Sequence, residues 1–129
     1  MREVIQTEQA PAPVGPYSQA IAATGKMIFV SGQIAIDPTS GEIVGDGDVA
    51  AQTQQVMQNL GEVLKAAGAN FEHVVKTSVF LVDMNDFVTV NRVYSQFFDE
   101  ATAPARACVQ AARLPKDVLV EVECIAVLA

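Results

Sequence analysis

The sequence predicts a single α+β domain in which two helices cover one face of a mixed β-sheet. Half of the 129 residues are hydrophobic and only 18% are charged, which is enough apolar material for one core. Two segments carry apolar residues at helical spacing, while the other apolar segments are short and either alternate with polar residues or are rich in β-branched ones. No repeat, low-complexity tract or charge block divides the chain, so we expect residues 1–129 to form one domain.

Turn signals separate three strands in the first third of the chain. A proline-rich connection at residues 10–16 joins an opening strand at about residues 4–7 to a second strand that begins near Tyr17. After a Thr-Gly-Lys turn, alternation predicts a third strand over residues 27–36. Its core face is expected to hold Ile28, Val30, Ile34 and Ile36, and its other face Met27, Phe29, Ser31, Gln33 and Ala35.

Two helices are expected, one before and one after a further strand. A Gly-Asp-Gly-Asp run and Gly68 are start and stop signals for a helix over residues 49–67. The β-branched segment at residues 74–82 predicts a strand. Polar capping residues then precede a second helix, which begins near Phe87 and ends near Asp99. The expected order is completed by two strands and is β-β-β-α-β-α-β-β.

The last third is expected to be a hairpin of strands at residues 106–114 and 118–128 around a Pro-Lys-Asp turn. If the turn pairs Arg113 with Val118, alternation gathers the polar side chains on one face. That face would hold Arg106, Cys108, Gln110, Glu121 and Glu123. The opposite face, on which we expect the helices, would hold Ala107, Val109, Ala111, Val120, Val122, Cys124 and Ala126.

The helix-free face would mix these polar groups with apolar side chains. Ile125 and Val127 belong to it, and the third strand adds Met27 and Phe29. Such a surface is a poor candidate for exposure to water. We therefore expect another subunit to cover it, in a symmetric oligomer with polar pockets at the subunit boundaries.

Arg106 and Glu121 are the main candidates for chemistry. A planar guanidinium binds a substrate carboxylate through two hydrogen bonds, and a partly desolvated carboxylate can position or deprotonate a water molecule. The alternative is a structural salt bridge, which alternation alone favours because ion pairs outnumber catalytic dyads. Glu123 would then be a second partner or a solvated residue.

The remaining candidates have ordinary structural alternatives. No histidine accompanies Cys108 in the sequence, so a packing or backbone role is favoured over that of a nucleophile, and His73 is interpreted as a surface or capping residue. Ser31 lacks the context of a hydrolase nucleophile, and its neighbour Gly32 indicates a bulge or a close backbone approach. Tyr17 is either a rigid pocket wall or a packed aromatic, and Asn91 is by default a solvated helix residue.

Composition excludes several classes of function. A net charge of −7 and a pI near 4.5 argue against nucleic acid as a partner. Two separated cysteines and one histidine are too few for a zinc site, so we expect no metal. Apolar runs are only a few residues long, and the N-terminal residues have no signal-peptide pattern, so we expect a cytoplasmic protein without a membrane span.

Four motifs resemble the Rid family, the YjgF-like reactive intermediate deaminases, and in particular its RidA branch. They are GPYSQA at residues 15–20, FVSGQI at 29–34, PARACV at 104–109 and VEVE at 120–123. The resemblance extends over nearly the whole chain. It implies a chorismate-mutase-like fold, a homotrimer with clefts between subunits, and no cofactor.

The resemblance also implies an activity, the hydrolysis of 2-imino acids and their enamine tautomers released by pyridoxal-phosphate-dependent dehydratases. By motif, Arg106 would hold the substrate carboxylate, Glu121 would orient or activate water, and the backbone around Cys108 would contact the imine. Tyr17, Ser31 and Asn91 would line the pocket. Ala103 stands where many members have an aromatic residue, which is expected to shorten a pocket wall and alter the preferred substrate size.

Two other functions remain open at this point. Some family members are described as ribonucleases or translation inhibitors, although the acidic composition opposes RNA binding. A non-catalytic sensor of small carboxylates, or a chaperone, is the third possibility.

Overall fold

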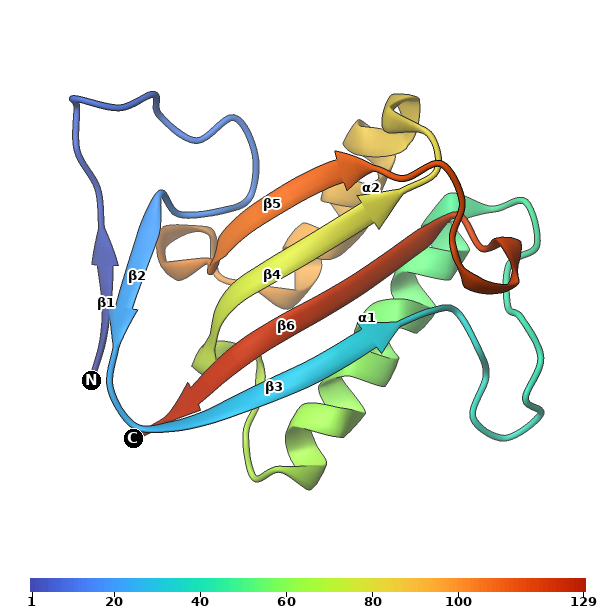
Figure 1. The fold of residues 1–129 in the computed structure, drawn as a ribbon, viewed down its shortest axis with the longest axis horizontal. Coiled ribbons are helices and arrows are strands. Elements are labelled where there is room, and N and C mark those ends of the chain that lie inside the picture. The colour runs from blue at the N-terminus through green and yellow to red at the C-terminus, as the bar shows by residue number, and fades with distance from the viewer.

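The computed structural model describes residues 1–129 and confirms the predicted fold class and element order (Figure 1). Its main sheet has the spatial order β3-β6-β4-β5, in which β6 is antiparallel to both neighbours and β4 is parallel to β5. The four strands are β3 (Lys26–Gln33), β4 (Val74–Leu81), β5 (Ala105–Gln110) and β6 (Val120–Leu128).

Both helices lie on the same side of the main sheet, behind it in the view of Figure 1. They are α1 (Val49–Ala66) and α2 (Phe87–Tyr94), and a short 3-10 turn follows α2. A separate two-stranded sheet, β1 (Arg2–Ile5) with β2 (Ala20–Ala23), stands at one end. No helix of the protein has the length and apolar character needed to cross a bilayer.

Local sequence signals account for the position of α1. The Asp48 side chain accepts a hydrogen bond from the Ala51 N–H at 3.1 Å, which is the N-cap that the Gly-Asp-Gly-Asp run predicted. At the other end Gly68 adopts a φ of 78°, the left-handed conformation that stops a helix at little cost in glycine. The prediction for this helix is confirmed to within a residue.

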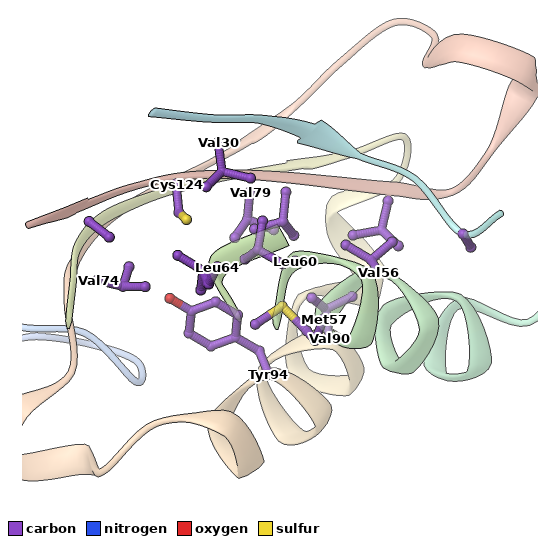
Figure 2. Close-up of a cluster of buried hydrophobic side chains, with 14 of the residues drawn as sticks. Val30, Val56, Met57, Leu60, Leu64, Val74, Val79, Val90, Tyr94 and Cys124 are labelled. Atoms are coloured by element: carbon purple, nitrogen blue, oxygen red, sulfur yellow. The ribbon is translucent and has the colours of Figure 1, made fainter. Parts of the chain in front are cut away.

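The core lies between the two helices and the sheet (Figure 2). Met57 and Leu60 of α1 are fully buried against the sheet, as is Tyr94 of α2. The Tyr94 hydroxyl shares a 2.8 Å hydrogen bond with the hydroxyl of Thr77 on β4. Because each of these polar atoms has a partner, burial of the tyrosine carries no uncompensated desolvation cost.

The predicted hairpin between the last two strands is wrong, because β4 lies between β5 and β6. Residues 111–119 instead pass over the end of β4, where the Ala111 N–H donates to the Leu81 carbonyl and the Val82 N–H donates to the Leu119 carbonyl. The physical reason is α2, which joins β4 to β5. A helical connection between neighbouring strands leaves them parallel and adjacent, which fills the place that the hairpin required.

Two element ends also differ from their predictions. β3 stops at Gln33, after an irregularity in its pairing with β6 between Val30 and Gln33. The irregularity changes the alternation, so Ala35 is fully buried where Ile34 and Ile36 were expected to be. The α-helical part of α2 ends at Tyr94, short of the predicted end near Asp99.

The face of the main sheet opposite the helices carries exposed apolar side chains. Met27 is 56% exposed, Phe29 70% and Val109 47%. Glu121 and Glu123 of β6 belong to this face, because they alternate with buried Val120, Val122 and Cys124. We call it the open face; the sequence predicted its mixture of apolar and acidic groups on β3 and β6.

Replacement of Leu60 by alanine is expected to lower the free energy of unfolding by about 2–5 kcal/mol, because it leaves a cavity between α1 and the sheet. Val63 on the same helix is 40% exposed, so Val63→Ala is the matched control and is expected to cost less than about 1 kcal/mol. Urea unfolding followed by circular dichroism at one protein concentration measures both. Equal losses would contradict the assigned core.

Candidate active site

Arg106 lies on the edge strand β5 and points to the helix side of the sheet. It is paired with buried Thr77 across the parallel β4–β5 ladder, and its Nη1 donates a 2.7 Å hydrogen bond to Oδ1 of Asn91 on α2. The amide oxygen of Asn91 is therefore occupied in holding the guanidinium. This contact joins two predicted site residues from different elements.

Three aromatic rings surround the same guanidinium. Its central carbon lies 5.0 Å from the ring centroid of Tyr94, 5.5 Å from that of Tyr17 and 5.6 Å from that of Phe87. Rings at these distances attract a cation without neutralising it. No carboxylate of the chain pairs with Arg106, since the one ion pair joins Arg113 to Asp117. The guanidinium is held in place while its charge remains available to an external anion.

A turn before β2 brings the backbone close to Arg106. The Tyr17 hydroxyl accepts a 3.1 Å hydrogen bond from the Val14 N–H, and the Tyr17 N–H donates to the Gly15 carbonyl at 2.9 Å. A Cβ on Gly15 would lie 3.0 Å from Nη2 of Arg106, so the absence of a side chain leaves room beside the cation. Tyr17 is thus a fixed ring next to Arg106, which favours the pocket-wall interpretation.

A small hollow of about 180 Å³ opens at this point. Arg106 is its only charged lining residue, and the others are Val14, Tyr17, Phe87 and Cys108. Sequence reasoning did not identify Phe87 and Tyr94 as neighbours of Arg106, because each fits the helical apolar pattern of α2. The signal that would have found them is the β4-α2-β5 connection, which places α2 over the edge strand.

Cys108 follows Arg106 on the same face of β5 and packs against the core. Burial raises the pKa of its thiol, and the positive charge of Arg106 opposes that shift only in part. A thiol with a raised pKa is a poor nucleophile at neutral pH. The environment of Cys108 therefore favours a packing or backbone role. A backbone role is available because β5 is an edge strand and has unpaired backbone groups along its free side.

Glu121 and Ser31 lie elsewhere, around the irregular part of β3. A Cβ on Gly32 would collide with the carboxylate of Glu121, so this glycine allows the carboxylate to lie against the β3 backbone. Ser31 precedes Gly32 and is exposed. These two predicted site residues are close in the fold but separate from the Arg106 group.

The electrostatic surroundings of Glu121 suit a proton acceptor. Burial raises the pKa of its carboxyl group above the ordinary value of 4.5, and repulsion from Glu123 raises it further. A carboxylate with a raised pKa holds a proton more strongly and is a better general base. The folded protein disfavours the ionised form of Glu121. Glu121 therefore contributes to the stability of the folded state below about pH 4.5, and this contribution is lost as the pH rises through the raised pKa of its carboxyl group.

The expectation that Arg106 and Glu121 share a face is wrong within one chain. Arg106 pairs with Thr77, which faces the helices, whereas Glu121 pairs with Phe80, which faces the other way. The error follows from the rejected hairpin, because β5 takes its register from β4 and not from β6. By the same reasoning Ala107 and Val109, expected under the helices, lie on the open face.

Ala103 and His73 do not line the hollow at Arg106. Ala103 is buried and lines a groove of about 480 Å³ beside α2, which adjoins the Arg106 group because Gly15 and Asn91 also line it. His73 accepts a hydrogen bond from the Asn70 N–H at 3.0 Å, which confirms its interpretation as a capping residue. No three His, Cys, Asp or Glu side chains come together as potential metal ligands.

The fold and these residues define a class of protein: a small α+β domain with an arginine that has no carboxylate partner on one side of its sheet and a carboxylate of raised pKa on the other. A family model described as Endoribonuclease L-PSP matches residues 7–128. A RutC family protein of Synechocystis is 64% identical over 126 residues, which is 98% of this chain and 96% of that protein. The 2-iminobutanoate/2-iminopropanoate deaminase of Escherichia coli is 51% identical over 129 residues, 98% of each chain.

Solved structures agree with these matches. The crystal structure of Escherichia coli TdcF with bound serine superposes with a TM-score of 0.75 and 46% identity, over 98% of this chain and 99% of that one. The chain belongs to the Endoribonuclease L-PSP family, also called the YjgF or RutC family. The family resemblance of the four motifs is confirmed.

Replacement of Glu123 by glutamine is expected to lower the pKa of Glu121, because it removes the like charge that raises it. Carbon-13 NMR of the side-chain carboxyl groups during a pH titration measures the shift. Glu72→Gln is the charge-matched control, because Glu72 precedes β4 at the end of that strand away from Glu121, and it should leave the Glu121 titration unchanged. An unchanged or higher Glu121 pKa in the Glu123 variant would contradict the electrostatic assignment.

Proposed function

We propose that this protein is a hydrolase of carbon–nitrogen bonds that converts 2-imino acids and their enamine tautomers to 2-oxo acids and ammonia. The substrates proposed are 2-iminobutanoate and 2-iminopropanoate, which pyridoxal-phosphate-dependent dehydratases release. The observation that carries the proposal is the guanidinium of Arg106, held by Asn91 and three rings with no carboxylate partner. It is supported by the names of relatives about half identical to this chain.

Arg106 would hold the α-carboxylate of the substrate through two charge-assisted hydrogen bonds. Amino acids and imino acids share this carboxylate, and TdcF was crystallised with serine. Tyr17 and Asn91 would limit the position of the bound group, since one stands beside the guanidinium and the other fixes it. The backbone of the edge strand near Cys108 would face the imine carbon and nitrogen.

Glu121 would act on the water. A protonated imine is already a strong electrophile, so a positioned water and one general base are sufficient, without a metal or another cofactor. Glu121 takes one proton from the water as its oxygen bonds to the imine carbon and the π electrons of the carbon–nitrogen double bond move to nitrogen. Glu121 then gives this proton to the nitrogen. As the carbon–nitrogen bond breaks, the hydroxyl oxygen forms the carbonyl and its remaining proton passes to the Glu121 carboxylate. The products are ammonia and a 2-oxo acid. Ser31, next to Gly32, would line this part of the pocket.

The two groups can cooperate only if they come from different copies of the chain, since they lie on opposite faces of one sheet. We therefore place the site between subunits of a homotrimer. The exposed apolar side chains of the open face, led by Phe29 at 70% exposure, support burial against a second copy. In this arrangement the open face of one subunit brings Glu121 to the edge strand β5 of the next.

The free thiols of Cys108 and Cys124 are consistent with a proposed cytoplasmic location.

Arg106→Ala is expected to reduce kcat/KM for imine hydrolysis by about 100-fold, the loss expected for two hydrogen bonds to a charged group. The assay supplies the imine from threonine with a threonine dehydratase and follows 2-oxobutanoate and ammonia. The protein should accelerate their release without changing threonine consumption. Arg113→Ala removes an equal charge from a solvent-exposed ion pair and is the matched control. Equal activity of the Arg106 variant and the parent would overturn the carboxylate assignment.

A mixture of Arg106→Ala and Glu121→Gln subunits is expected to be more active than either variant alone. After the two are unfolded and refolded together, some interfaces combine an intact Arg106 from one subunit with an intact Glu121 from its neighbour. Light scattering should show a trimer for the parent and for both variants. A co-assembled mixture no more active than the separate variants, or a stable monomer at micromolar concentration, would contradict a shared site.

The description of the matching family favours a second candidate, an endoribonuclease. The net charge of −7 opposes it, because RNA affinity depends largely on phosphate contacts. RNA cleavage that persists through extensive purification and disappears in Arg106→Ala would favour the ribonuclease over the deaminase. A carboxylate sensor or chaperone would bind its ligand without turnover in either assay.

A further inference from the structure

We propose that Phe87 and Val14 set the upper size of the substrate side chain, so that the protein prefers 2-imino acids with short apolar side chains. The inference rests on the proposed function and specifies the substrates of the same site.

The lining of the hollow at Arg106 determines which part of a substrate enters it. Once the carboxylate binds the guanidinium, the imine must face water and a base, and the hollow offers no base. Its walls beside Arg106 are Val14, the rings of Tyr17 and Phe87, and the thiol of Cys108. The side chain of a 2-imino acid is its one apolar part, and it alone gains from burial against these walls.

The hollow is small in one chain, and the second subunit that we propose to cover this edge of the sheet would close it further. At about 180 Å³ it is smaller than the roughly 300–1,000 Å³ typical of sites for drug-sized ligands. It therefore suits a metabolite of few atoms.

The two proposed walls differ in how firmly they are held. Phe87 is the first residue of α2, is half-buried and packs against the core, so core contacts hold its ring. Val14 is 80% exposed on the loop, although the hydrogen bond from its N–H to the Tyr17 hydroxyl holds its backbone. Phe87 thus forms a rigid wall and Val14 a rim that can be trimmed without a cost in core packing.

Phe87→Leu and Val14→Ala should each widen the hollow and favour longer substrates. The six-carbon imino acid formed from leucine is compared with 2-iminobutanoate, each generated in place by an amino acid oxidase and trapped competitively with semicarbazide. The ratio of kcat/KM for the longer to the shorter substrate should rise about tenfold, since one or two methylene groups in an apolar pocket are worth at least that much discrimination. Phe87→Leu also removes a ring that supports the Arg106 guanidinium, but this loss weakens binding of the carboxylate group equally in both substrates. The ratio therefore reports recognition of the substrate side chain alone.

Val88→Ala is the matched control, because this valine neighbours Phe87 on α2 but is 73% exposed and does not line the hollow at Arg106. Its selectivity ratio should equal that of the parent. Unchanged ratios in both the Phe87 and Val14 variants of an active protein would overturn this inference and leave the proposed function intact. If Phe87→Leu fails to fold, the Val14 variant decides the matter alone. A parent protein inactive toward every imino acid would overturn the proposed function, and this inference with it.

Discussion

One unpaired guanidinium organises the features that point to function. Arg106 projects from an edge strand, where a long side chain would ordinarily be free to move, yet Asn91 and the surrounding rings hold it in one orientation. Aromatic faces attract a cation but leave its charge in place, whereas a carboxylate would neutralise it. The guanidinium is therefore pre-organised to bind an anion, although the chain as a whole has a net charge of −7. Preparation of this kind lowers the entropic cost of binding a small carboxylate.

On the other side of the sheet, the surroundings of the Glu121 carboxylate disfavour its charge. Glu121 lies against the backbone at Gly32 and near a like charge, Glu123, so its ionised form is disfavoured. No arginine within the chain relieves this cost, because the one ion pair joins Arg113 to Asp117. Separation by the thickness of the sheet keeps the two charges from neutralising each other in a single chain. This geometry makes assembly part of the proposed chemistry and not only a means of covering apolar surface.

Much of the fold could be predicted because helices and strands have different periods. The spacing of apolar residues and the Asp48 cap located α1 closely, and alternation on β6 correctly assigned Val120, Val122 and Cys124 to the buried face. Alternation also placed Met27 and Phe29 on the open face, which is why a covering partner could be expected from the sequence. Alternation alone did not predict the irregularity in β3, which reverses the assignment of every later residue. The signal for it is Gly32, because a glycine inside a strand indicates a bulge or a close backbone approach.

The candidate site likewise has some features that depend on neighbouring residues along the chain and others that depend on contacts between distant segments. By itself the sequence determined the element order, the two helix positions, the family motifs and the residue types available for chemistry, because these depend on contacts and spacings along the chain. Only the tertiary structure decided that β4 separates β5 from β6, that Arg106 faces α2, and that Glu121 faces away from it. Alternation specifies that neighbouring residues of a strand point in opposite directions. Which strand lies beside which, and therefore which side chains share a face, depends on how α2 connects β4 to β5 and packs over the sheet.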